Sequence, residues 1–212
     1  MLLVIESATE ACSIALIEGE RLIDERHERV GRGHAERLLP MIAELLGDRR
    51  PSGILVDCGP GSFTGVRVGL AAAHGLAIGW RVPLHGCTST ALLAIAAHEG
   101  SAVGVAMRGG HGEFFVQTYG DESFAPLDEL RSLPPDRAAA EIGAQVVIGS
   151  AAEALVAGRG FGRAIDALPR AADALRLPPA LRGLAPRPIY GRAPDAKPLL
   201  GDAAGGIEAP MA

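Results

Sequence analysis

Short apolar and alternating runs open the chain. Residues 2–6, 11–17 and 21–28 each form such a run, and turn-length polar segments separate them. This pattern predicts an antiparallel meander of three strands. In residues 33–46 the apolar positions then recur on one broad helical face, and Gly47 follows the last of them. The spacing therefore predicts a helix directly after the meander.

Strands and helices alternate over the next fifty residues. Residues 54–58 predict a short buried strand, 64–79 a helix, 82–85 a strand and 89–98 a helix rich in Ala and Leu. Right-handed crossovers would assemble the resulting order, βββαβαβα, into one mixed sheet with helices on its faces. We expect an α/β fold in which residues 1–100 form a ribonuclease H-like lobe.

A second, smaller and degenerate lobe is expected over residues 101–190. Residues 102–107 and 113–119 predict a hairpin around a glycine-rich turn, and residues 145–148 predict a further strand. Pro and Gly dominate from residue 178 onward. Residues 191–212 are therefore expected to form an irregular C-terminal tail.

Charge and cysteine content narrow the functional classes. The net charge of −5 argues against a large nucleic-acid surface, although residues 159–197 hold eight basic and three acidic residues. A solvated basic segment is the favoured interpretation of that region, with contact to tRNA or to an acidic partner kept open. Three widely spaced cysteines predict reduced, buried thiols in a cytoplasmic protein. No segment is long and apolar enough to predict a membrane span, and no signal peptide is expected.

A glycine-rich loop, GPGSFTGVRVG at residues 59–69, joins the strand at 54–58 to the helix that follows. It matches neither the Walker A pattern nor the dinucleotide fingerprint. Its backbone could still lie close to an anion or a nucleotide at the helix start. The candidate residues for this loop are Gly59, Gly61, Ser62, Thr64 and Gly65. Further glycines inside the helix predict a close helix–helix contact, because each costs about 1 kcal/mol relative to Ala.

Four blocks of sequence together resemble one protein family. Residues 4–16, 32–42, 59–69 and 188–192 are similar to the TsaB (YeaZ) family, a paralogue of the catalytic subunit TsaD in the actin and heat-shock ATPase superfamily. The resemblance implies two ribonuclease H-like lobes. It also implies a scaffold and activator without turnover of its own, in the complex that makes threonylcarbamoyladenosine in ANN-decoding tRNA. No catalytic residue and no metal ligand is then expected in this chain.

The same resemblance implies the partners. We expect a heterodimer with a TsaD-type subunit, regulation by a TsaE-type ATPase, a homodimer when the chain is alone, and only indirect contact with tRNA. No cofactor of its own is expected, since ATP and metal would belong to the partner subunits. The predicted partner-binding positions lie on the first two helices, at His34, Arg37, Leu38, Met41, Leu45, Thr64, Arg67, Val68, Ala71, Ala72 and Gly75.

Two catalytic functions are the alternatives to this interpretation. A metallopeptidase would need two histidines four residues apart on a helix, and no pair among the six histidines has that spacing. A ribonuclease H-like nuclease dependent on Mg²⁺ would need converging carboxylates, for which Glu6, Glu44 (or Glu36 on the same helix) and Asp57 are the candidates. Solvated or capping roles are favoured for these acids. The family usually carries Asp at the position of Glu6, which favours a non-catalytic subunit.

Overall fold

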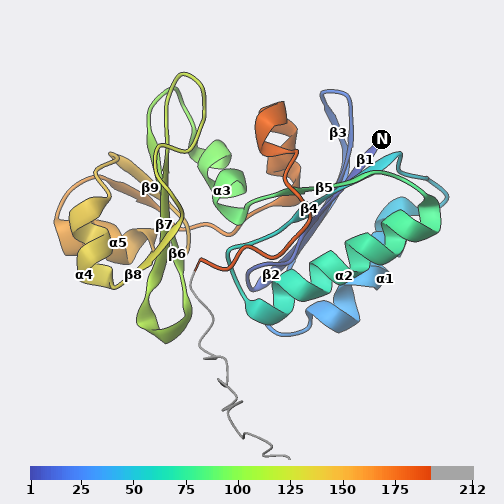
Figure 1. Ribbon diagram of the computed structural model, residues 1–212, viewed down its shortest axis with the longest axis horizontal. Helices are drawn as coiled ribbons and strands as arrows, with labels where there is room; N and C mark the ends of the chain where they lie inside the picture. The colour runs from blue at the N-terminus through green and yellow to red at the C-terminus, as the bar shows by residue number, and fades with distance from the viewer. Residues whose placement is uncertain (192–212) are drawn as a thin grey trace, which may run out of the picture.

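The computed structural model describes residues 1–191. Two five-stranded sheets stand side by side, each with its own helices (Figure 1). Both sheets are mixed, because each contains antiparallel and parallel pairs of neighbouring strands. The predicted α/β fold with two lobes is confirmed.

The first lobe follows the predicted order of elements. Its strand order is β3-β2-β1-β4-β5, with the meander antiparallel and the later strands parallel. The largest shift is that of the fifth strand, which begins two residues later than predicted. The elements are β1 (Leu2–Glu6), β2 (Ala11–Glu18), β3 (Arg21–Arg29), α1 (His34–Leu46), β4 (Gly53–Asp57), α2 (Phe63–Trp80) and β5 (Leu84–Cys87).

Three apolar cores hold the layers together. Helices α1 and α2 pack on the outer face of the first sheet. Helix α3 (Ser89–Ala97) and the 3-10 segment η2 (Ala171–Arg176) fill the space between the two sheets (Figure 1). The third core lies on the outer face of the second sheet. The three cysteines are free and buried within these cores, as predicted.

The second lobe is more elaborate than the sequence predicts. The hairpin and the strand near residue 146 are present, but two short strands and two short helices were missed. The strand order is β10-β9-β6-β7-β8. The elements are β6 (Val103–Arg108), η1 (Gly110–Gly112), β7 (Phe114–Tyr119), β8 (Arg131–Leu133), α4 (Pro135–Glu141), β9 (Val146–Ile148), α5 (Ala152–Arg159) and β10 (Arg163–Ile165).

The chain returns to the first lobe after β10. Ala171 N donates to Ser13 Oγ at 2.9 Å, and Ile189 N donates to the Cys58 carbonyl oxygen at 2.8 Å. The short segment η3 (Pro179–Leu181) lies between these contacts. Residues 171–190, which the sequence pattern assigns to the second lobe, therefore pack on the first, because their apolar side chains complete its edge and inner face. The predicted tail at 191–212 lies almost entirely outside the described residues.

Within residues 1–191, none of the helices combines the length and the hydropathy that a membrane-spanning segment needs.

Candidate functional site

An apolar groove runs between α1 and α2 on the outer face of the first lobe. Its volume is about 450 Å³. Leu39 stands at its rim with 51% of its surface exposed, although a Leu in a folded core is usually buried. The lining consists of aliphatic side chains and glycine: Ala35, Leu38, Leu39, Val68, Ala71, Ala72, Gly75 and Leu76.

Four predicted partner-binding residues of α1 lie in the core of this chain. His34, Leu38, Met41 and Leu45 are all buried, with at most 3% of their surface exposed. The prediction that His34, Met41 and Leu45 face a partner is therefore wrong, because the periodic apolar face of α1 packs on its own sheet. Leu38 still contributes to the groove floor. His34 Nε2 lies 3.0 Å from the Ala11 carbonyl oxygen, which ties the start of α1 to β2.

Arg37 is the predicted α1 residue that does lie at the surface. Its guanidinium donates to Glu28 on β3 at 2.7 Å and to Glu44 on α1 at 2.8 Å. The bond that Arg37 donates to Glu44 holds the pKa of Glu44 below its usual value. Arg37 is not a lining residue of the groove, and its charge is paired with these two carboxylates.

The predicted positions on α2 divide between two flanks of the helix. Val68, Ala71, Ala72 and Gly75 line the groove. Thr64 and Arg67 belong to the predicted set but do not line it, since Thr64 lies in the first turn of α2, before the groove, and Arg67 contacts Tyr190.

The glycines of the loop and of the first turns of α2 pack against the β1–β2 turn. A β-carbon on Gly65 would lie 2.1 Å from the Ser7 carbonyl oxygen, and one on Gly69 would lie 2.3 Å from Ser7 Oγ. The close contact that these glycines permit is made with Ser7, which corrects the predicted helix–helix contact. At Gly75, by contrast, a β-carbon would meet no atom within 4 Å.

The predicted anion loop makes internal hydrogen bonds with several of its polar groups. Gly59 N donates to Asp57 Oδ1 at 2.8 Å, and Ser62 N donates to the Ala8 carbonyl oxygen at 2.6 Å. Ser62 Oγ accepts from Gly65 N at 3.3 Å and caps α2. These contacts give the loop a structural role. Three of its amides, those of Gly59, Ser62 and Gly65, are consequently engaged within the chain, and its proximity to an anion stays a prediction.

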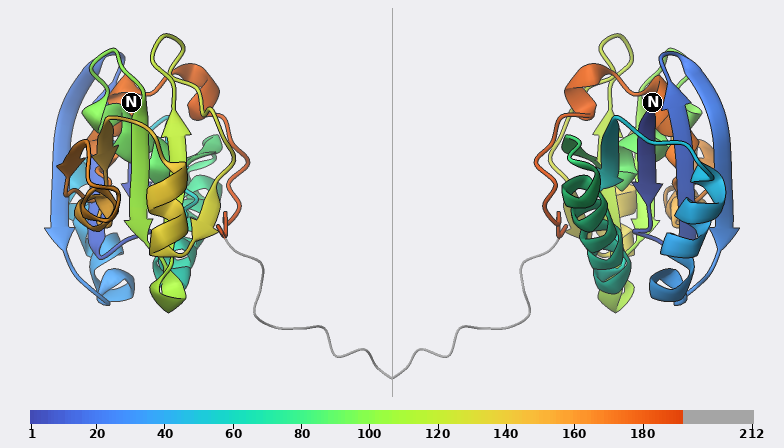
Figure 2. Two further views of the ribbon diagram at one scale, coloured as in Figure 1. Left: turned by 90° about the vertical axis from the view of Figure 1, so that its left-hand side faces the viewer. Right: turned by 90° about the vertical axis from the view of Figure 1, so that its right-hand side faces the viewer.

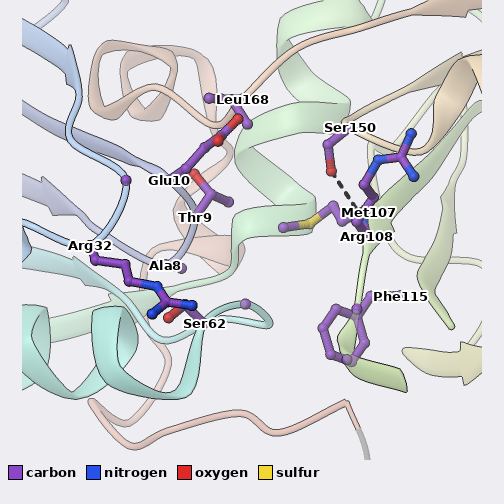
Figure 3. A pocket seen from close by; sticks show the side chains of 14 residues that line it. Ala8, Thr9, Glu10, Arg32, Ser62, Met107, Arg108, Phe115, Ser150 and Leu168 are labelled. Atoms are coloured by element: carbon purple, nitrogen blue, oxygen red, sulfur yellow. Dashed lines mark hydrogen bonds between the residues drawn. The ribbon is translucent and has the colours of Figure 1, made fainter. Parts of the chain in front are cut away.

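A cleft of about 460 Å³ opens between the lobes. Figure 3 shows Arg32 and Ser62 on the side of the first lobe and Met107 and Phe115 on the side of the second. Arg108 is held at the end of β6, where its N–H donates to Ser150 Oγ at 3.0 Å. The cleft is thus mixed in character, with both apolar and basic walls.

Glu6 and Asp57 form a buried pair of carboxyl groups. Ser89 Oγ donates to Asp57 Oδ2 at 2.6 Å, and Ala8 N donates to Glu6 Oε1 at 2.8 Å. Glu6 Oε2 has no hydrogen-bond partner in residues 1–191. Burial raises the pKa of Asp57 to about 7, and burial together with repulsion by Asp57 raises the pKa of Glu6 well above its usual value.

The three carboxylates of the nuclease alternative do not converge. Glu44 lies on the surface of α1, bound to Arg37, whereas Glu6 and Asp57 are buried under the glycine loop. Across residues 1–191, no three or more His, Cys, Asp and Glu side chains are grouped so that they could hold a metal ion. The predicted nuclease constellation is therefore wrong, since one of its three members is on another surface.

Comparison with known proteins identifies the family. The family model described as tRNA N6-adenosine threonylcarbamoyltransferase, TsaD, matches residues 25–142. The tRNA threonylcarbamoyladenosine biosynthesis protein TsaB of Escherichia coli is 38% identical over 98 residues, which cover 44% of this chain and 42% of that protein. The TsaB protein of Haemophilus influenzae is 41% identical over 104 residues, covering 46% and 43%. The chain belongs to the TsaD family, in its TsaB (YeaZ) branch.

Solved structures extend the similarity over nearly the whole chain. A Pseudomonas aeruginosa protein described as uncharacterized, with similarity to peptidase YeaZ, superposes with a TM-score of 0.75 at 28% identity. The superposition covers 90% of this chain and 99% of that one. A second P. aeruginosa structure, YeaZ, gives a TM-score of 0.71 at 29% identity and covers 82% and 88%. The matches to the two TsaB proteins span less than half the length of those relatives.

Two surface residues are not among the site residues predicted from the sequence. Phe63 and Tyr190 are 57% and 45% exposed, and their rings stack with centroids 5.7 Å apart. Arg67 places its guanidinium carbon 3.5 Å from the centre of the Phe63 ring. An aromatic residue at a helix start is the only sequence signal, because the partner ring comes from 127 positions further along the chain.

Proposed function

We propose that this chain is a non-catalytic subunit of the system that makes threonylcarbamoyladenosine in tRNA, and that it binds a TsaD-type catalytic subunit through the α1–α2 groove. The observation that carries the proposal is the groove itself, an apolar surface with an exposed Leu39 in a family whose named relatives belong to this pathway. Exposed apolar surface rimmed by charge marks sites of protein association.

Small residues on α2 support the docking of a helix. Ala71, Ala72 and Gly75 leave the helix backbone open along the groove, so that a partner helix can approach closely. Gly75 has no neighbour within this chain that requires its small size, although an interior glycine costs about 1 kcal/mol relative to Ala. A partner seated in the groove would account for that cost.

The same groove supports self-association when the catalytic subunit is absent. An isologous contact between two copies would cover the same apolar surface. The TsaD-type subunit and a second copy would then compete, so a homodimer is the expected state of the isolated chain. A TsaE-type ATPase would act on the heterodimer, with ATP and metal held by the partner subunits.

Buried carboxyl groups support the absence of turnover. The two acids that would be placed for metal chemistry, Glu6 and Asp57, are buried, and their hydrogen bonds go to the glycine loop, the β1–β2 turn and α3. Their pKa values are raised, which favours the protonated form that binds metal poorly. We therefore assign them to the structure of the first lobe.

Association with the catalytic subunit tests the proposal. Light scattering after size-exclusion chromatography should show a heterodimer with the TsaD-type protein of the same genome. Leu39→Glu should abolish it, because a charge at the exposed rim would be desolvated in the interface. Leu127→Glu is the matched control, since Leu127 is 66% exposed on the second lobe. A heterodimer that forms equally well with both variants would place the interface elsewhere.

A further inference from the structure

The flank of α2 that faces away from α1 forms a continuous strip with residues 184–190. Arg67 Nε donates to Tyr190 Oη at 3.0 Å, and His74 Nε2 lies 3.2 Å from the Pro186 carbonyl oxygen. Leu184 pairs with Gly86 on the edge strand β5. Figure 2 shows this C-terminal segment running beside α2 at the edge of the first lobe. The strip is separate from the α1–α2 groove, because none of these residues lines the groove.

The two segments that build the strip carry only positive charge. Helix α2 and residues 184–190 contain two arginines, Arg67 and Arg187, and no Asp or Glu, in a chain whose net charge is −5. Arg67 and Arg187 are exposed, and neither takes part in the ion pairs formed within residues 1–191. Exposed, unpaired arginines on segments that contain no carboxylate favour the binding of a polyanion.

One end of the strip is an exposed cluster of two stacked aromatic rings and a guanidinium. The rings of Phe63 and Tyr190 are inclined by 26° and are both about half exposed. The Arg67 guanidinium lies over the Phe63 ring. Unpaired RNA bases stack on aromatic rings and on guanidinium planes, and arginines beside them bind the phosphates. An acidic protein segment would use the charges but would gain little from the exposed rings.

We propose that this strip, formed by Phe63, Arg67, His74, Arg187 and Tyr190, binds RNA directly. Arg67 and Arg187 would contact the phosphate backbone, and the Phe63 and Tyr190 rings would stack an unpaired base. The identity of the RNA as tRNA rests on the proposed function. The chain would then contribute to tRNA binding as well as to the activation of its partner, because the groove and the strip can be occupied together.

Fluorescence anisotropy with an unmodified ANN-decoding tRNA transcript tests the proposal, using the full chain alone and together with its TsaD-type partner. The double variant Arg67→Ala/Arg187→Ala should bind about fivefold more weakly at low salt. The slope of log affinity against log salt should fall in magnitude by about 1.5, since each lost phosphate contact removes about 0.7–0.9. The double variant Arg21→Ala/Arg50→Ala, which removes the same charge from exposed positions away from the strip, should bind as the unaltered chain does.

Phe63→Leu separates stacking from charge. This variant keeps an apolar side chain at an exposed position, so the fold should be unaffected. Its affinity for a single-stranded oligonucleotide should fall about fivefold, while its affinity for duplex RNA should change little.

Three results would overturn the proposal. The first is that the strip variant and the control variant bind tRNA with equal affinity. The second is that neither the chain nor the complex binds tRNA. The third is that the chain binds polyglutamate instead of RNA, and that this binding depends on the two arginines. If the chain forms no heterodimer with the TsaD-type subunit but still binds RNA in a way that depends on Arg67, the proposed function is contradicted. The RNA site is supported in that case.

Discussion

Glu6 and Asp57 lie next to each other at the C-terminal ends of the adjacent parallel strands β1 and β4, and both are buried. Glu6 caps the β1–β2 turn through Ala8, and Asp57 binds the glycine loop through Gly59 and α3 through Ser89. The pair thus connects the turn, the loop and the helix on which the first lobe depends.

This pair predicts that the protein becomes less stable as the pH rises. Burial raises the pKa of both groups, that of Asp57 to about 7, so the folded state holds their protons more tightly than the unfolded chain. The stabilisation is complete below the unfolded pKa of about 4 and is lost as the pH rises through the folded values. Urea unfolding between pH 5 and pH 8 should therefore show a declining free energy of unfolding.

Glu6→Gln isolates the contribution of the pair. The amide keeps the acceptor for Ala8 N and carries no charge, so we expect the variant to be more stable than the original chain at pH 8 and less sensitive to pH. Glu44→Gln is the control, and it should change the stability at pH 8 in the opposite direction, because the bond to Arg37 lowers the pKa of Glu44. Stability that rises with pH in the original chain would contradict the assignment.

Two glycines of α2 should respond in opposite ways to alanine. Gly65→Ala places a β-carbon against the Ser7 carbonyl oxygen and should destabilise the fold by about 1–3 kcal/mol. Gly75→Ala meets no atom of this chain and should stabilise it by up to about 1 kcal/mol. Thermal unfolding measures both effects. The same Gly75→Ala variant should bind the TsaD-type subunit more weakly, and unchanged binding would show that no partner approaches that position.

Neighbouring residues of α1 should separate folding from association. Met41→Ala removes a fully buried side chain and should cost about 2–5 kcal/mol in unfolding free energy. Leu39→Ala removes a half-exposed side chain, so its stability should change by about 0.5 kcal/mol or less. Chemical denaturation and titration with the catalytic subunit together should show that only Leu39→Ala binds weakly while remaining well folded. An unfolding free energy of Met41→Ala that differs from that of the original chain by about 0.5 kcal/mol or less would contradict the placement of the core.

The fold of the first lobe could be predicted because its elements differ clearly in period. The alternating meander, the amphipathic α1 and the buried strand β4 each occupy a segment of distinct pattern. The second lobe was harder, since β8, β9 and β10 have three residues each and α4 has seven. Such short elements contain too few positions for a period to show, and they are held by tertiary packing.

The candidate site was predicted only in outline, because periodicity identifies an apolar face without saying what covers it. The apolar positions at the centre of the periodic face of α1, among them Met41 and Leu45, pack on its own sheet. The groove is lined by neighbouring positions such as Leu39. The glycine loop likewise indicated close packing, but Ser7, the residue that its helix contacts, is more than fifty residues away in sequence. The stacked rings of Phe63 and Tyr190 depend on the returning C-terminal segment, which no local pattern predicts.

The most direct test of the account is threonylcarbamoyl transfer to tRNA by the cognate TsaD-type subunit, ATPase subunit and adenylate-forming enzyme, measured with and without this chain. We predict that transfer depends on the chain, that Leu39→Glu fails to restore it, and that Leu127→Glu restores it fully. Full transfer in the absence of the chain would contradict the account.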